Sequence, residues 1–97
     1  MAGWVFRSEG EYPLTLRLPA GTIKTIGRTA RADFIVDAPL VSRVHCRLTA
    51  DRSNQLIVED LGSTNGTRVN GQTASRSVLK AGDTVTVGRV EFVVEET

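Results

Sequence analysis

Strand-forming residues dominate this chain, and no apolar pattern with a 3.6-residue period extends beyond two helical turns. Val, Ile and Thr make up 27 of the 97 residues, a composition typical of β-strands. Nine Gly and three Pro interrupt the strand-like runs, as turns between short strands require. Leu14, Leu16 and Leu18 alternate with polar residues, which is the pattern of a half-buried strand. The chain is therefore expected to be all-β.

We predict ten short strands, at residues 4–7, 14–18, 22–26, 34–36, 44–50, 55–59, 67–69, 72–74, 84–87 and 90–95. Strands of this number and spacing favour a two-sheet β-sandwich. Asn70-Gly71 predicts a two-residue hairpin between two of them, because both residues tolerate positive φ. No linker, repeat or low-complexity tail is present, so residues 1–97 are expected to form one domain.

Charge and cysteine content argue against several functional classes. The net charge is +1, and the ten Arg and two Lys are spread among eleven acidic residues, so the basic stripe of a nucleic-acid binder is missing. Cys46 is the single cysteine, which leaves no disulfide framework and no thiol metal site. No apolar run could span a bilayer, and residues 1–20 do not resemble a signal peptide. We expect a cytoplasmic protein with no membrane contact, metal or cofactor.

Three loop segments carry the side chains of interest: Gly27-Arg28, Ser42-Arg43 and the run from Ser63 to Thr67. Taken singly, each is better interpreted as ordinary structure, namely a surface Arg after a turn glycine, a polar loop and a tight turn. Taken together they supply two guanidinium groups, several hydroxyls and a side-chain amide. These donors suit an oxyanion and a stretch of peptide backbone, and none of them performs bond-breaking chemistry. The Asn65-Gly66-Thr67 glycosylation sequon has little weight without an export signal.

The order of these motifs resembles a forkhead-associated (FHA) domain. The resemblance rests on Gly27-Arg28, then Ser42 and His45, then the run from Ser63 through Thr67 to Asn70-Gly71. It covers residues 4–95, nearly the full chain. It implies a sandwich of about eleven mostly antiparallel strands whose loops at one end bind phosphothreonine in a partner peptide or protein, with the domain acting as a monomer.

The resemblance also assigns roles to individual residues. The residues expected to bind the phosphopeptide are Arg28, Ser42, Arg43, Thr64 and Asn65. Arg28 would contact the phosphate or the adjacent peptide backbone, Ser42 would donate its hydroxyl to a phosphate oxygen, and Arg43 would add a charge-assisted contact. Thr64 would offer a hydroxyl or a backbone donor near the phosphate, and Asn65 would hold the peptide main chain. Gly27, His45 and Gly66 occupy architectural positions, with His45 tying loops together.

Two points stay open at the level of sequence. In a simple up-and-down meander the loops with Ser42 and Asn65 fall at the same end, but the Arg28 loop falls at the opposite end. Only the resemblance places the Arg28 loop at the same end as the loops with Ser42 and Asn65. Leu40 is more apolar than residues common at its position, and it either lines the groove for a downstream peptide side chain or packs beneath its own loop. The second interpretation is slightly favoured.

Three other functions compete with phosphopeptide binding. An enzyme using His45 and Cys46 is disfavoured, because adjacent strand residues point to opposite faces and the pair cannot share a hydrogen bond. Binding of single-stranded nucleic acid is disfavoured, because the few aromatic residues lie mostly at core-like strand positions. The serious alternative is a phosphate-independent scaffold that uses an outer sheet face or a strand edge.

Overall fold

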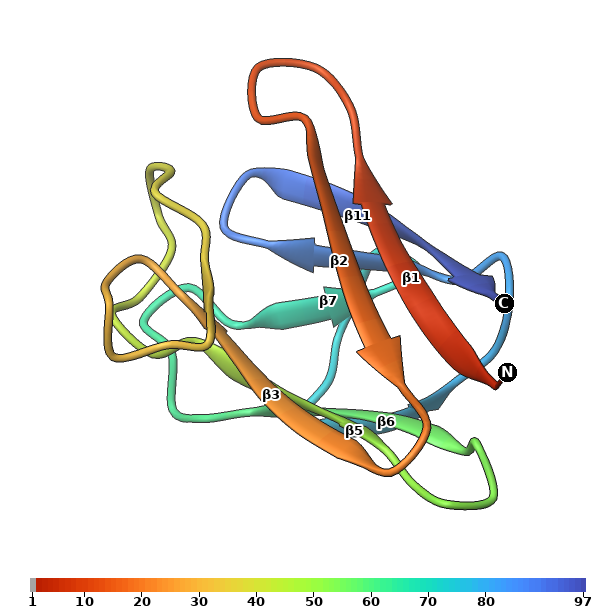
Figure 1. The fold of residues 1–97 in the computed structure, drawn as a ribbon. Coiled ribbons are helices and arrows are strands. Elements are labelled where there is room, and N and C mark those ends of the chain that lie inside the picture. Colours follow the sequence, from red (N-terminus) through yellow and green to blue (C-terminus); the bar gives the residue numbers. More distant parts are fainter. Residues whose placement is uncertain (1) are drawn as a thin grey trace.

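Eleven strands organise residues 2–97, which the computed structural model describes (Figure 1). In chain order they are β1 (Gly3–Ser8), β2 (Leu14–Pro19), β3 (Thr22–Gly27), β4 (Phe34–Ile35), β5 (Cys46–Ala50), β6 (Leu56–Asp60), β7 (Thr67–Val69), β8 (Gln72–Thr73), β9 (Arg76–Leu79), β10 (Thr84–Val87) and β11 (Val90–Glu96). One sheet has the order β2-β1-β11-β10-β7-β8, and the other has the order β4-β3-β5-β6-β9. The predicted all-β, two-sheet sandwich is confirmed.

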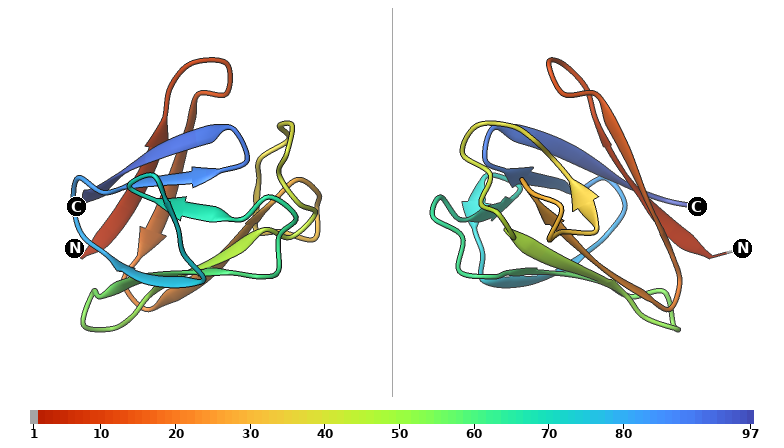
Figure 2. Two further views of the ribbon diagram at one scale, coloured as in Figure 1. Left: turned by 180° about the vertical axis from the view of Figure 1, so that it is seen from behind. Right: turned by 60° about the vertical axis from the view of Figure 1, so that its left-hand side comes forward.

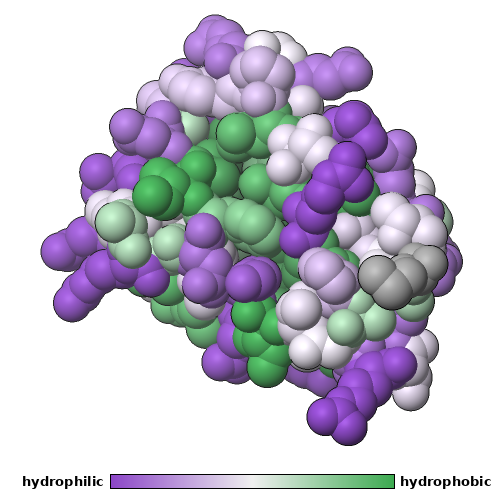
Figure 3. Space-filling view, viewed as in Figure 1, coloured by the Kyte–Doolittle hydropathy of each residue, from purple (hydrophilic) through white to green (hydrophobic). Residues whose placement is uncertain are grey.

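Alternate residues of the facing strands fill the space between the two sheets. In β2, Leu16 and Leu18 are buried while their polar neighbours are exposed, as period-two alternation requires. Phe6 and Phe92 meet edge to face within the core, with ring centroids 6.2 Å apart. Burying one such side chain contributes about 1.5–3 kcal/mol. Apolar surface also gathers over the gap between β2 and β3 in the space-filling view (Figure 3).

The residue pattern missed one strand, β9. This strand turns Ser77 inward and leaves Val78 about half exposed, so its apolar residues do not alternate with polar ones as in an ordinary half-buried strand. Strand ends also differ from expectation by one or two residues. β5 begins at Cys46 because Val44 lies in a bend, and β4 and β8 each end one residue early.

The chain does not follow a simple meander around the loop that carries Arg28. β4 has two residues and pairs with β3 in parallel, with Ile26 opposite Phe34 and Gly27 opposite Ile35. It is therefore not a full antiparallel strand between β3 and β5. Instead β3 and β5 are antiparallel neighbours, with Ile26 opposite Cys46. The end of β3 thus lies beside the start of β5, so Arg28 and Ser42 lie at the same end of the sandwich. This end is called the rim below.

The two ends of the described chain lie together, away from this rim (Figure 2). β1 pairs with β11 along four residue pairs, and the Thr97 amide donates to the Gly3 carbonyl at 2.9 Å. The predicted hairpin joins β7 to β8, where Asn70 and Gly71 have φ of 52° and 83°. Residues 2–97 contain no helix long and apolar enough to cross a bilayer.

Candidate functional site

Three loops meet at one end of the sandwich (Figures 1 and 2). They are the loop after β3, the long segment between β4 and β5, and the loop between β6 and β7. Backbone hydrogen bonds join them directly. The Arg28 amide donates to the Ser42 carbonyl at 2.9 Å, and the Leu61 amide donates to the His45 carbonyl at 2.9 Å. The three motifs that are far apart in sequence are therefore neighbours in the fold.

Gly27 permits the close contact between the first two loops. A Cβ at this position would overlap the Arg43 carbonyl oxygen and would lie 2.9 Å from the Ala32 Cβ. Only glycine lets two backbones approach so closely. The approach places Arg28 against the neighbouring loop, where its Nε donates to the Val41 carbonyl at 3.0 Å. Its terminal nitrogens are left available to a ligand.

His45 joins the second loop to the third. Its side chain is fully buried, the Ser42 amide donates to its Nδ1 at 3.0 Å, and its Nε2 lies 2.9 Å from the Gly66 carbonyl oxygen. The amide can only donate and the carbonyl can only accept, so the proton resides on Nε2. Gly66 has a φ of 80°, in the left-handed region that favours glycine. Both ring nitrogens are occupied, so His45 acts within the scaffold.

Asp60, at the end of β6, holds the third loop in place. Its carboxylate accepts hydrogen bonds from the amides of Gly62 and Ser63 at 3.1 Å, from the Ser63 hydroxyl, and from the Thr67 hydroxyl at 2.8 Å. Partial burial acts to raise the pKa of Asp60, but the hydroxyls of Ser63 and Thr67 and the Ser63 amide outweigh it and hold the pKa below its ordinary value. The charged carboxylate is the form that fits the loop.

A shallow hollow of about 370 Å³ opens between these loops, and it is lined by Arg28, Val41, Ser42, Arg43, Val44, Gly62 and Thr64. Within it the Thr64 amide donates to Ser42 Oγ at 3.0 Å. Because that oxygen accepts from Thr64, the Ser42 hydroxyl proton is free to donate outward. The Thr64 amide is thereby occupied, which leaves its hydroxyl as the group it offers to a ligand.

The hollow has an unbalanced positive charge. Arg28 and Arg43 are exposed, and neither belongs to the two ion pairs found within residues 2–97, Arg7–Glu95 and Arg47–Glu59. A guanidinium group offers five donors in a planar fork, so two of them beside free hydroxyls suit a tetrahedral oxyanion. Four of the five predicted binding residues, Arg28, Ser42, Arg43 and Thr64, line this one hollow.

Asn65, the fifth, lies beside the hollow. Its Nδ2 donates to the Leu40 carbonyl at 3.2 Å, which leaves one N–H and the amide oxygen for other partners. Leu40 itself has a φ of 69° and is 47% exposed. The favoured interpretation that Leu40 packs beneath its loop was therefore wrong. A bulky side chain in the left-handed region is unusual and often marks functional strain.

Sequence reasoning missed Val41, Val44 and Gly62 as lining residues. Val41 and Val44 flank Ser42 and looked like strand or loop packing residues, and Gly62 looked like a plain turn. Arg31 was also passed over, although it lines a second hollow with Arg43. A lone Arg in a loop gives no sequence signal unless the loop is already known to border a site.

Neither Cys46 nor a metal cluster offers further chemistry at this rim. Burial, with a smaller contribution from the charge of Asp60, raises the pKa of the Cys46 thiol to about 12, and the side chain belongs to the core. Such a thiol is inert near neutral pH. Residues 2–97 contain no group of three or more His, Cys, Asp or Glu placed to hold a metal ion.

Comparison with known proteins supports one family. The sequence matches the model of the FHA domain over residues 24–88. It is 37% identical over 71 residues to the glycogen accumulation regulator GarA of Mycobacterium tuberculosis, covering 73% of this chain and 43% of GarA. It is 38% identical over 80 residues to the ABC transporter ATP-binding/permease protein Rv1747 of the same organism, covering 82% of this chain and 9% of the transporter.

A solved FHA domain from a study of phosphothreonine-dependent FHA interactions superimposes with a TM-score of 0.86 at 30% identity, covering 96% of this chain and 95% of that one. The chain spans less than half the length of GarA and of Rv1747. The family match extends over more than half of the chain, and it includes the glycine, arginine, serine, histidine and asparagine that build the rim. The chain belongs to the FHA domain family.

Proposed function

We propose that this domain binds a threonine-phosphorylated peptide or protein at the hollow between its three loops. The observation that carries the proposal is the convergence of Arg28, Ser42, Arg43 and Thr64 on one hollow. Their outward donors have no acceptor within residues 2–97. A site that keeps charged donors unpaired favours an anion over water, because charge-assisted hydrogen bonds are about twice as strong as neutral ones.

The donors match what a phosphothreonine brings. At neutral pH its phosphate carries about −1.5 to −2 charges and three acceptor oxygens. The guanidinium forks of Arg28 and Arg43 neutralise the charge, and the hydroxyls of Ser42 and Thr64 complete the set. Asn65 holds the peptide backbone through its remaining N–H and its amide oxygen. An extended peptide then lies across the rim, with its phosphate in the hollow.

The hollow also offers a basis for preferring phosphothreonine over phosphoserine. Val41 is buried, but the half-buried Val44 lines the hollow together with the polar groups, so the threonine methyl has a small apolar surface to contact. One methyl group in a well-packed site contributes about 1–3 kcal/mol. We expect threonine selectivity of about tenfold, which corresponds to about 1.4 kcal/mol.

The relatives support this assignment. The 30%-identical FHA domain was studied for phosphothreonine-dependent interactions. A further relative at 30% identity, FhaA, has its FHA domain complexed with the intracellular domain of Rv3910. On this basis a non-catalytic adaptor role with a protein as partner is proposed for the present chain. We further propose, from the sequence alone, that the domain is cytoplasmic and monomeric and that it binds neither nucleic acid nor membrane.

A phosphate-independent scaffold is the second candidate, because one sheet face carries an apolar row. Ile23, Thr49, Ile57 and Val78 are consecutive cross-strand partners on β3, β5, β6 and β9. Ile23 is 61% exposed and Val78 is 52% exposed. This outer-face row lies apart from the hollow, so the two functions are separable by mutation.

Calorimetric titration tests the proposal with three versions of one peptide, carrying phosphothreonine, phosphoserine or threonine. We expect the phosphothreonine peptide to bind tightest and the unphosphorylated peptide to show no measurable binding. Arg28→Ala and Ser42→Ala should each weaken binding about tenfold or more, whereas the exposed Arg52→Ala, which removes the same charge from the β5–β6 turn, should not. Equal binding of the phosphorylated and unphosphorylated peptides would rule out the phosphate site and favour the outer-face row.

A further inference from the structure

We propose that the rim selects phosphopeptides whose two flanks carry opposite charges. This inference rests on the proposed function and adds the chemistry of the sequence around the phosphothreonine. It follows from two further hollows, one on each side of the phosphate hollow. The first is basic and the second is acidic, and both border the loop that contains Ser42.

The basic flank is a hollow of about 540 Å³ lined by Thr29, Ala30, Arg31 and Arg43. It shares Arg43 with the phosphate hollow, so the two hollows adjoin. The Thr29 hydroxyl donates to the Arg43 carbonyl at 3.2 Å, which fixes the relation between the loops. Arg31 is exposed. The nearby Asp33 carboxylate accepts hydrogen bonds from the amide and the hydroxyl of Thr25. These neutral donors leave its negative charge in place, but Asp33 lines neither hollow.

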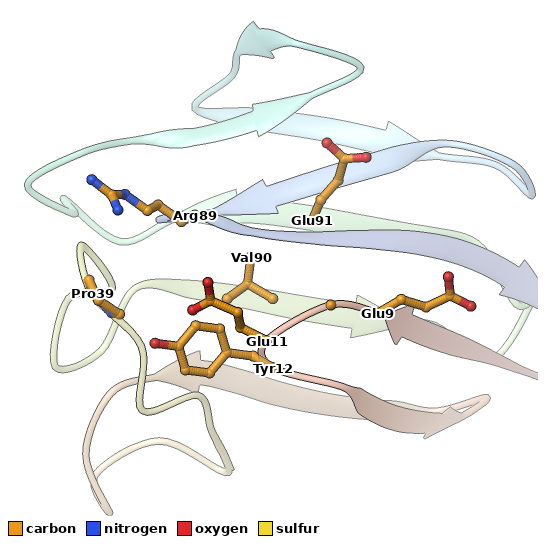
Figure 4. Close-up of a pocket in the computed structure, with 8 residues that line it drawn as sticks. Glu9, Glu11, Tyr12, Pro39, Arg89, Val90 and Glu91 are labelled. Carbon is orange, nitrogen blue, oxygen red and sulfur yellow. The ribbon is translucent and has the colours of Figure 1, made fainter.

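The acidic flank is a pocket of about 370 Å³ lined by Glu9, Gly10, Glu11, Tyr12, Pro39, Arg89, Val90 and Glu91 (Figure 4). Its lining therefore holds three carboxylates and one guanidinium. In the close-up, Glu11 and Tyr12 come from the β1–β2 loop, Arg89 from the β10–β11 turn, and Val90 and Glu91 from the start of β11, with Pro39 facing them (Figure 4). Tyr12 and Val90 give the pocket an apolar part, which suits the methylene stem of a Lys or Arg side chain.

Contacts through Leu40 and Pro39 place the acidic pocket next to the phosphate hollow. Asn65, which adjoins the hollow, donates to the Leu40 carbonyl. A Cβ at Gly88 would lie 2.9 Å from the Leu40 carbonyl carbon and from the Pro39 oxygen. Pro39 lines the acidic pocket. The order along the rim is therefore Arg31, Arg43, Ser42, Leu40 and then Pro39 with the acidic pocket beyond it.

An extended peptide is long enough to reach both flanks. At about 3.3 Å per residue, seven or eight residues cover about 25 Å. The molecule measures 33 × 26 × 25 Å, so such a peptide crosses the whole end of the sandwich. Exposed charge pairs are individually weak and are screened by salt. The two charged flanks therefore determine which phosphopeptide binds best, while the phosphate contributes most of the affinity.

Two phosphothreonine peptides of identical composition test the inference. One carries two Glu before the phosphothreonine and two Lys after it, and the other carries the Lys first and the Glu last. Net charge and phosphate are the same, so a difference in affinity reports the order of the flanks alone. At low ionic strength we expect a ratio of dissociation constants of about ten, falling toward one as added salt screens the charges. The sign of the difference fixes the direction in which the peptide runs.

Variants that replace a charged side chain with a neutral one test whether the two hollows cause the ratio of dissociation constants. Arg31→Gln and Glu11→Gln should each reduce the ratio by about a factor of three and leave binding phosphate-dependent. Arg52→Gln and Glu96→Gln, which remove the same charges from the opposite end, should leave the ratio unchanged. In the second control, the new side-chain amide oxygen can still accept the hydrogen bond that Asn54 donates to Glu96.

Three outcomes would overturn the inference. Equal affinity of the two peptides, with binding still dependent on phosphate, rejects the charged flanks and leaves the proposed function intact. A ratio that survives in both Arg31→Gln and Glu11→Gln places the preference elsewhere. Binding of neither peptide above its unphosphorylated twin rejects the proposed function and the inference with it.

Discussion

Arg28 is held in place by a backbone contact and a side-chain contact, and a different cation cannot reproduce the second. Its amide bonds the Ser42 carbonyl, and its Nε bonds the Val41 carbonyl. The guanidinium can make this second contact and still turn its terminal nitrogens to a ligand, because its five donors form a planar fork. A Lys side chain has one compact ammonium group and cannot do both with the same geometry.

We therefore expect Arg28→Lys to weaken phosphothreonine-peptide binding about tenfold, although the charge is kept. Thermal unfolding should change little, because the side chain is exposed. Calorimetric titration of the variant measures the loss. Affinity equal to that of the wild type would mean that Arg28 acts only as a point charge.

A substitution at Leu40 is expected to change peptide specificity without changing stability. A leucine with positive φ costs about 1–2 kcal/mol relative to a right-handed conformation, and glycine is free of that cost but loses more entropy on folding. Leu40→Gly should therefore leave the melting temperature nearly unchanged. The same change removes a 47%-exposed apolar side chain from the rim, so discrimination between apolar and polar residues near the phosphothreonine should fall. An unchanged preference in a peptide array would exclude Leu40 from the contact surface.

The loop between β6 and β7 depends on the charge of Asp60. The folded-state pKa of this carboxyl lies below its ordinary value of 3.8. Its contribution to stability is therefore complete above the ordinary value and is lost as pH falls through the folded-state value. Asp60→Asn places an NH2 group among donors and should cost about 1–3 kcal/mol near neutral pH.

Urea unfolding from about pH 5 to about pH 3 measures this contribution. Wild-type stability should fall more steeply than that of Asp60→Asn, so that the two curves converge in acid. Parallel curves would show that the carboxylate does not stabilise the loop. Ser63→Ala, which removes one donor to Asp60, should show an intermediate slope.

Most of the strands could be predicted from sequence, and β4 and β9 show why the rest could not. The alternation of Leu with polar residues predicts β2. β9 turns Ser77 and Leu79 inward and Val78 outward, so its apolar residues fall on both faces and give no alternating pattern. β4 looked like an ordinary strand, and no residue in it signals parallel pairing with β3.

That pairing decided whether the site could form. The side chains of the rim could be recognised as hydrogen-bond donors from the sequence. Their convergence depends on which strands pair, and the local residue pattern does not reveal that pairing. The hydrogen bonds that orient them were also hidden. Nothing local to Ser42 indicates that its hydroxyl accepts from Thr64, 22 residues away, and nothing local to Leu40 indicates positive φ.

The ends of the described chain and the three loops of the site lie at opposite ends of the sandwich. The chain ends meet beside β1 and β11, while the three binding loops lie at the other end (Figure 2). In the relatives GarA and Rv1747 the matched region covers 43% and 9% of the protein.

Mapping of backbone amide shifts by two-dimensional NMR tests the central claim most directly, since it reports both phosphate dependence and the place of binding. On addition of a phosphothreonine peptide, we predict that the amides of residues 28, 40–43 and 62–66 shift, and that the unphosphorylated peptide shifts none of them. Shifts confined to Ile23, Thr49, Ile57 and Val78, or equal shifts with both peptides, would contradict the convergence of the three loops into a phosphate-binding site.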